Sequence, residues 1–209
     1  SSCLERFARP AGPLLGALSL LPAAAAGAVE IDFIALSAAE ERDAKVYEEI
    51  WAQYGARIVA AFGAPTCQPF AEPKVAAVVA NATSHSGGPK HPMRLRSSYF
   101  RDVKQATLVH ELGHRHLWQL VERLDGIDGH QTLFLVLDQV WADVWGEKFA
   151  KDRIRGESEW RAEYDYAQAW SWARSLSADQ RTRLWNELLS MNGFASACER
   201  PVSTTAAAR

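Results

Sequence analysis

The spacing of apolar residues predicts a small sheet near the start of the chain and helices after it. Residues 30–36 and 74–80 are short apolar runs typical of strands. Residues 93–100, MRLRSSYF, alternate between apolar and polar positions, as a half-buried strand does. Apolar residues recur at helical spacing in the other long segments, which predicts helices at residues 37–62, 102–124, about 131–151, about 156–176 and 177–189.

Two serines mark predicted helix starts. Ser37 is followed three residues later by Glu40, which predicts a capping box, and Ser177 is the predicted N-cap of the last helix. The pattern predicts a single α+β domain, mostly helical, over residues 29–200. Residues 201–209 are expected to be a frayed tail.

The first residues differ in character from the rest. Arg6 and Arg9 precede an uncharged stretch at 10–29 that ends in an A-x-A pattern at 26–28, so residues 1–28 are predicted to be a secretory signal peptide. We therefore expect an exported protein, periplasmic or secreted, without stable membrane insertion after cleavage. A membrane anchor through 10–29 is the alternative, against which two prolines count. A cytoplasmic protein is a further variant if this leader is not a signal.

The charge of the chain bears on its binding partners, and its cysteines bear on a possible disulfide. The net charge of -2, with acids and bases interspersed, shows no basic footprint for nucleic acid, so no nucleic-acid partner is expected. Once the leader is removed, Cys67 and Cys198 remain, and in an exported chain they can form a disulfide. Two unrelated thiols are the alternative.

The segment TLVHELGHRHLW, residues 107–118, carries the candidate chemistry. His110 and His114 are four residues apart, so on a helix they face the same way and can bind one metal ion. Glu111 is rotated aside, where it can take a proton from a water on that ion; this is the H-E-x-x-H arrangement of zinc hydrolases. A solvated polar face is the alternative reading. The apolar flanks and Gly113, which lets another element approach, count against it.

A catalytic zinc also needs a third protein ligand. On the following helix, Asp143 and Glu147 lie in line with an apolar stripe; one could bind the ion and the other could support a ligand histidine. His130 is an alternative ligand, although its place at a helix N-terminus disfavours a cation. The other candidates rank lower or are expected to be surface or loop residues: Asp138, His116, His85 and His91.

VHELGH, followed one helix later by DVWGEKFA, resembles the gluzincin metallopeptidases. The resemblance is strongest to the CAAX-prenyl and heat-shock zinc peptidase families and their small soluble relatives. In those families a later helix reads E-x-x-A-D-x-F-A; its first acid is the third zinc ligand and its second supports a ligand histidine. The resemblance covers roughly residues 100–152. It implies a zincin-like fold, with the small sheet packed on a two-helix site for one Zn²⁺.

Laid on this chain, the family pattern implies Asp143 as the third ligand and Glu147 as the supporting acid. The chain departs from the pattern, since Asp143 replaces the usual Glu, Glu147 the usual Asp, and Gly146 the usual Ala. A shorter ligand acid requires the two helices to approach more closely. Gly113 and Gly146 would permit that approach.

These observations predict a zinc-dependent endopeptidase acting on peptide or protein substrates, with Glu111 as general base. The edge of strand 93–100 is a candidate for binding substrate by strand addition. The alternatives are a zinc amidase or other hydrolase on the same scaffold, and a non-catalytic protein with a structural zinc. Four residues are unranked candidates for stabilising the oxyanion: Tyr99, Tyr164, Tyr166 and Arg153.

Overall fold

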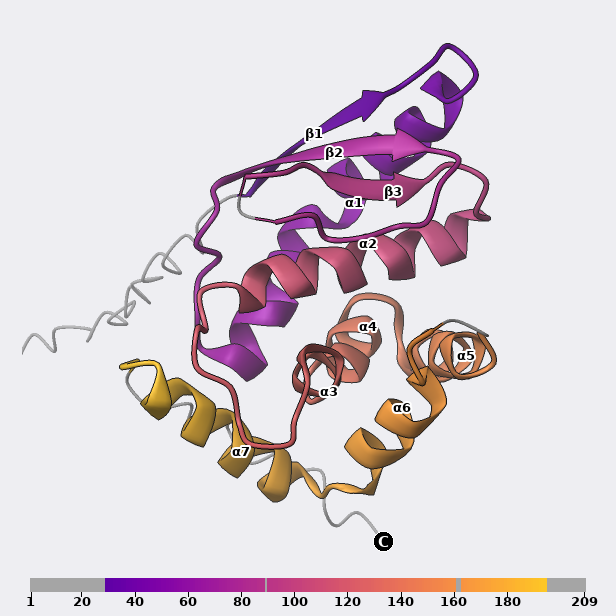
Figure 1. The fold of residues 1–209 in the computed structure, drawn as a ribbon. Helices are drawn as coiled ribbons and strands as arrows, with labels where there is room; N and C mark the ends of the chain where they lie inside the picture. Colours follow the sequence, from indigo (N-terminus) through magenta and orange to yellow (C-terminus); the bar gives the residue numbers. More distant parts are fainter. Residues whose placement is uncertain (1–28, 89, 161–162, 195–209) are drawn as a thin grey trace, which may run out of the picture.

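The computed structural model describes residues 29–88, 90–160 and 163–194 (Figure 1). The predicted leader, the predicted tail and Cys198 lie outside these ranges. Within them the chain is α+β and mostly helical. Its elements are β1 (Glu30–Ala35), α1 (Glu41–Thr66), β2 (Lys74–Ala80), β3 (Met93–Arg96), α2 (Arg101–Leu117), α3 (Gly129–Phe134), α4 (Leu137–Trp145), α5 (Glu147–Ser158), α6 (Tyr166–Ser175) and α7 (Ala178–Met191).

The three strands form one parallel sheet in the order β1-β2-β3. Helices α1 and α2 pack against it, and α3 to α6 lie on the other side of α2 (Figure 1). In the central strand Val75, Ala77 and Val79 are buried, because alternate residues of a strand face the same side. The sheet and α1 therefore form a support on which α2 is fixed.

The outer edge of β3 is partly covered by the chain itself. His85 and Arg94 form an antiparallel bridge, with backbone hydrogen bonds of 3.0 and 2.9 Å. Arg94 Nε also donates to the carbonyl of Thr83 at 2.7 Å. The edge predicted to take a substrate strand is thus occupied by residues 83–85 over part of its length.

Several predicted boundaries differ from the observed ones. The strand at 93–100 ends at Arg96, and the helix at 102–124 ends at Leu117. The first helix begins at Glu41, four residues later than predicted. Its capping box does not form, because Ser37 Oγ donates to the Glu40 carboxylate, which also accepts the Asn81 N–H at 2.7 Å. The predicted N-cap at Ser177 is confirmed, and Ser177 also forms a capping box with Gln180 by exchanging two hydrogen bonds.

The predicted helix at 131–151 is divided into α3, α4 and α5. The break between α4 and α5 lies at Gly146, whose φ of 91° and ψ of 161° suit glycine alone. A Cβ on Gly146 would meet nothing within 4 Å, so this glycine serves the bend and not a close approach of helices. The close approach of two helices occurs instead at Gly113 of α2, where a Cβ would lie 2.5 Å from Leu133 Cδ1 of α3.

Buried tryptophans join the C-terminal helices to the rest of the core. Trp170 of α6 stacks on Phe134 of α3, with ring centroids 3.8 Å apart. Trp185 of α7 donates its Nε1–H to the carbonyl of Thr66 at the end of α1, at 2.9 Å. Among the described residues, no helix has both the length and the apolar character that a membrane span needs.

Candidate metal centre

Three histidines converge between α2 and α3. His110 and His114 lie one turn apart on α2, and their Nε2 atoms are 3.2 Å from each other. His130, the second residue of α3, places its ring centroid 4.6 Å from that of His114. One nitrogen from each ring lies within 4.8 Å of the other two. The convergence follows from Gly113, which allows α3 to pack closely on α2.

The spacing of these nitrogens suits a zinc ion. Two imidazole ligands at Zn–N distances of 2.0–2.1 Å in tetrahedral geometry lie about 3.3 Å apart. The distance of 3.2 Å between the His110 and His114 Nε2 atoms is close to this value. Neutral imidazoles are also the donors that zinc commonly takes in proteins. The residues present therefore fit a zinc site with three protein ligands.

Glu157 at the end of α5 orients His110. Its Oε1 lies 2.9 Å from His110 Nδ1, and its Oε2 accepts the Nε1–H of Trp170 at 2.8 Å. When Nδ1 carries the proton and donates it to Glu157, the lone pair of His110 Nε2 is free for a metal. The carboxylate in contact with His110 is thus that of Glu157, not that of Glu147 as predicted.

Asp143 and Glu147 do not join this group. Both are exposed and line a separate pocket of about 400 Å³. Glu147 pairs with Lys151 at 3.6 Å, and the backbone carbonyl of Asp143 accepts from Arg57. The cause is local, because the residues that α4 buries are Leu137, Val140, Trp141 and Val144, and the bend at Gly146 ends this face before Glu147. Asp143 therefore does not lie with His110 and His114 as predicted, and the residue that does is the alternative candidate, His130.

In the sequence analysis, the place of His130 at a helix N-terminus was expected to disfavour a cation. This objection does not apply in the observed fold. Helix α3 has only six residues, and its N-cap Asp128 places a carboxylate at that end. The other alternative, Asp138, accepts two hydrogen bonds from Arg181 at 2.8 and 2.9 Å.

His116 was predicted to be a surface or loop residue, and this prediction is wrong. It is buried, and its Nε2 lies 3.0 Å from Thr66 Oγ1. Burial lowers its pKa to about 4. His85 and His91, by contrast, are exposed loop residues as expected.

Burial tunes the ionisation of the site. Burial lowers the pKa of His114 well below its ordinary value and that of His130 to about 4, and the neighbouring His110 acts in the same direction. Burial also opposes the charged form of His110, but the Glu157 carboxylate outweighs it and raises the pKa of His110. His114 and His130 are therefore neutral near pH 7, as metal ligation requires.

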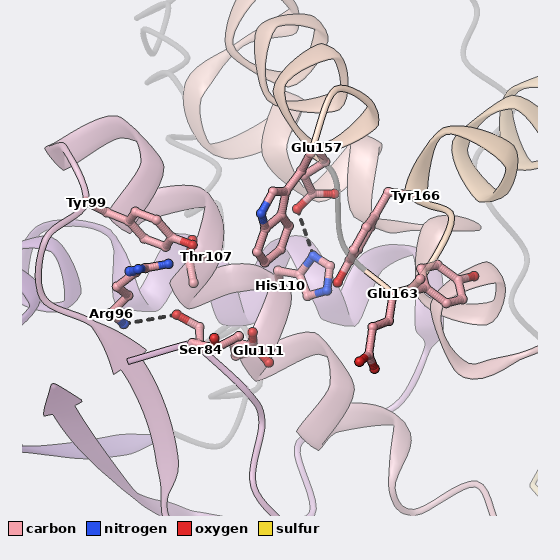
Figure 2. Close-up of a pocket in the computed structure, with 12 residues that line it drawn as sticks. Ser84, Arg96, Tyr99, Thr107, His110, Glu111, Glu157, Glu163 and Tyr166 are labelled. Carbon is pink, nitrogen blue, oxygen red and sulfur yellow. Dashed lines mark hydrogen bonds and ion pairs between the residues drawn. The ribbon is translucent and has the colours of Figure 1, made fainter. Parts of the chain in front are cut away.

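Glu111 faces the same pocket as His110 (Figure 2). This pocket has a volume of about 570 Å³. The side chain of Glu111 is largely buried, and burial raises its pKa to about 7 against the opposing effect of His110. Its carboxylate can therefore both take and release a proton near neutral pH.

No family model, curated protein or solved structure matches the chain. The resemblance to gluzincins accordingly remains a prediction from the motifs, and the assignment of the site depends on its geometry.

The candidates for oxyanion stabilisation can be separated by their contacts. Tyr166 Oη lies 3.3 Å from His130 Nε2, and Tyr99 lines the same pocket. Tyr164 also lines it, but its hydroxyl lies 2.8 and 2.9 Å from the two carboxylate oxygens of Asp128. Arg153 pairs with Asp102 at 3.1 Å and lines an adjoining pocket. Tyr166 is therefore the candidate whose hydroxyl contacts one of the three histidines, whereas Tyr164 stacks its ring on His130 and directs its hydroxyl to Asp128.

Sequence reasoning missed Glu157. The buried residues Ala150 and Ile154 of α5 precede it by seven and three positions, which places Glu157 on the buried face of that helix. This spacing was visible in the sequence, but the predicted helix boundary at 156 separated Glu157 from the two apolar residues.

Proposed function

We propose that the protein is a zinc-dependent hydrolase of peptide bonds, with His110, His114 and His130 as zinc ligands and Glu111 as general base. The observation that carries this proposal is that His110 and Glu111 line one open pocket, beside a set of three histidine donors. Zinc bound there would acidify the attacking water and polarise the substrate carbonyl.

Glu111 would move the proton. One of its carboxylate oxygens takes a proton from the attacking water and later delivers it to the leaving nitrogen. With no ion bound, burial raises the pKa of Glu111 to about 7, and the charge of a bound zinc would lower it towards that of an ionised general base. Tyr166 would donate its hydroxyl proton towards the developing oxyanion.

The arrangement supports a catalytic site over a structural one. A structural zinc is enclosed by four protein ligands, whereas a catalytic zinc has three and an open position. Here three histidines come together, within the described ranges, next to a pocket of about 570 Å³.

We further propose that a peptide substrate lies along residues 83–84. Thr83 and Ser84 accept hydrogen bonds from Arg94 and Arg96 of β3 and line the pocket, so we expect them to take the place of that strand in backbone pairing. The predicted leader at 1–28 supports export, which would place peptide substrates outside the cytoplasm.

The test is a matched pair of variants. Zinc-loaded protein is expected to hydrolyse peptides, and Glu111→Gln should retain zinc while losing hydrolysis by at least about 100-fold. Glu163→Gln is the control, because Glu163 is an exposed residue lining the same pocket. Full activity in the Glu111→Gln protein would refute the mechanism. Hydrolysis of cell-wall amides without hydrolysis of peptides would favour the amidase alternative.

A further inference from the structure

Arg96 is a cation in the pocket that has no anionic partner. It is the last residue of β3, and its side chain lines the pocket with Tyr99, on the side away from His110 and Tyr166 (Figure 2). Within the described ranges, the guanidinium forms no ion pair and no hydrogen bond. It lies over the ring of Tyr99, 5.5 Å from the ring centroid.

The position of Arg96 is set by the sheet. Met93 and Leu95 are buried in the core, so strand alternation directs Arg94 and Arg96 to the opposite face. The backbone of Arg96 is held on both sides, since its N–H donates to Ser84 Oγ and its carbonyl accepts from Tyr47 Oη, each at 2.9 Å. The guanidinium therefore projects into the pocket from a fixed base.

The Nε atom of Arg96 is buried and has no hydrogen-bond partner among the described residues. A buried donor without a partner is costly, and the few that occur in proteins call for an explanation. Arg153 also has a buried Nε without a partner, but its guanidinium forms an ion pair with Asp102 at 3.1 Å, whereas that of Arg96 forms none among the described residues. A ligand oxygen in the pocket would instead accept from the Nη atoms at the end of the Arg96 guanidinium, which also form no hydrogen bond among the described residues.

The carboxylates of the pocket do not fill this role. Glu157 is engaged by His110 and Trp170, and Glu111 lies beside His110. Glu163 is exposed on the other side of the pocket (Figure 2). Among the described residues that line the pocket, Arg96 carries the one Lys or Arg charge. The pocket thus has an acidic end at the histidines and a basic end at Arg96.

We propose that Arg96 binds a carboxylate of the peptide substrate and so fixes which bond lies at the histidines. A guanidinium binds a carboxylate through two parallel hydrogen bonds, which gives direction as well as affinity. The carboxylate can come from the C-terminus of the peptide or from an Asp or Glu side chain. This inference concerns the substrate of the proposed hydrolase and rests on that function.

The test measures binding without turnover. Zinc-loaded Glu111→Gln protein is dialysed to equilibrium against three N-acetylated pentapeptide libraries, and bound peptide is quantified by mass spectrometry. The first library has free C-termini and no acidic residue; the second is the same but amidated; the third is amidated and has one Glu. We expect the first or the third to bind about 10- to 100-fold more tightly than the second. The preferred library identifies the source of the carboxylate.

Variants assign the preference to Arg96. Adding Arg96→Met should abolish it, and Arg96→Lys should retain a weaker preference, because lysine keeps the charge but not the paired hydrogen bonds. Arg101→Met is the control, since it removes the same charge from an exposed ion pair with Glu49. Equal binding of all three libraries, binding of none, or a preference that survives Arg96→Met would overturn the inference.

Hydrolysis by zinc-loaded protein with Glu111 intact is measured in parallel, so that the role of Arg96 and the hydrolase function can each be refuted independently. Hydrolysis without a charge preference would refute the role of Arg96 alone. An Arg96-dependent preference without hydrolysis would refute the proposed function alone.

Discussion

Trp170 donates its indole N–H to Glu157, 2.8 Å away, and Glu157 places its other oxygen 2.9 Å from His110 Nδ1. A residue of α6 thereby fixes a residue of α5, which in turn orients a candidate metal ligand on α2. The three residues connect separate helices through polar contacts that are partly shielded from water. Such contacts fix the tautomer and the direction of the histidine ring.

Removing this support should weaken metal binding. Glu157→Gln is expected to lower zinc affinity by about 10- to 100-fold, because the amide no longer favours a proton on His110 Nδ1 as a carboxylate does. Trp170→Phe should have a smaller effect in the same direction. Competition with a chromogenic chelator measures the affinity, and the exposed neighbour Glu159→Gln is the control. Unchanged affinity in the Glu157→Gln protein would argue against a metal at His110.

The third ligand can be identified by zinc content. His130→Ala should lose most of the bound zinc, whereas Asp143→Ala should retain it, because Asp143 lies in a different pocket. Metal analysis after gel filtration gives the stoichiometry. The original expectation of Asp143 as ligand would be restored if the pattern were reversed.

Acid should destabilise the fold partly through His116. The pKa of His116 is about 4 in the folded protein, against the ordinary value of 6.5 expected in the unfolded chain. Between these pH values the folded protein keeps His116 neutral, whereas the unfolded chain binds a proton. Its contribution to stability is therefore complete above about pH 6.5 and is lost as the pH falls towards 4. Between pH 7.5 and 5 the loss should be about 2 kcal/mol.

The measurement is urea unfolding of metal-free protein at both pH values. His116→Gln keeps a donor for Thr66 but does not titrate, so its stability should fall less than that of the parent chain. His85→Gln, at an exposed loop position, is the control. An equal acid-induced loss in His116→Gln and the parent would contradict the assignment.

The contact between α2 and α3 should be sensitive to a single methyl group. A Cβ at Gly113 would meet Leu133 Cδ1 at 2.5 Å and Phe62 Cζ at 3.0 Å, so Gly113→Ala is expected to cost about 1–3 kcal/mol. Gly63→Ala in α1 is the matched control, because a Cβ there meets nothing within 4 Å. It should be neutral or stabilising by up to about 1 kcal/mol. Thermal unfolding compares the two, and a stabilised Gly113→Ala protein would show that α3 does not pack as described.

Local patterns predicted where the three strands lie and that His110 and His114 share a face, although the third strand was predicted four residues too long. Strand β2 has the predicted bounds, and the i, i+4 spacing of His110 and His114 places both rings together, because periodicity alone determines those features. The other residues that converge on His110 and His114 could not be predicted in this way, because their positions depend on tertiary structure. Asp143 and Glu147 were expected to share a face of one continuous helix, and the bend at Gly146 removed that condition.

The position of His130 could not be deduced from spacing, because it depends on how closely α3 packs on Gly113. Glu157 was accessible in principle through its spacing from Ala150 and Ile154. It was missed because the predicted helix boundary at residue 156 placed Glu157 in the next helix, whereas α5 continues to Ser158.

The backbone conformation of Gly146, which lies outside the pocket, affects the position of Glu157 inside it. Any side chain there would resist a φ of 91° and would tend to straighten the junction of α4 and α5. Straightening would swing the far end of α5, and with it Glu157, away from His110. Mutational screens for impaired turnover should therefore recover residue 146 as well as the residues that line the pocket, although no substrate would touch it.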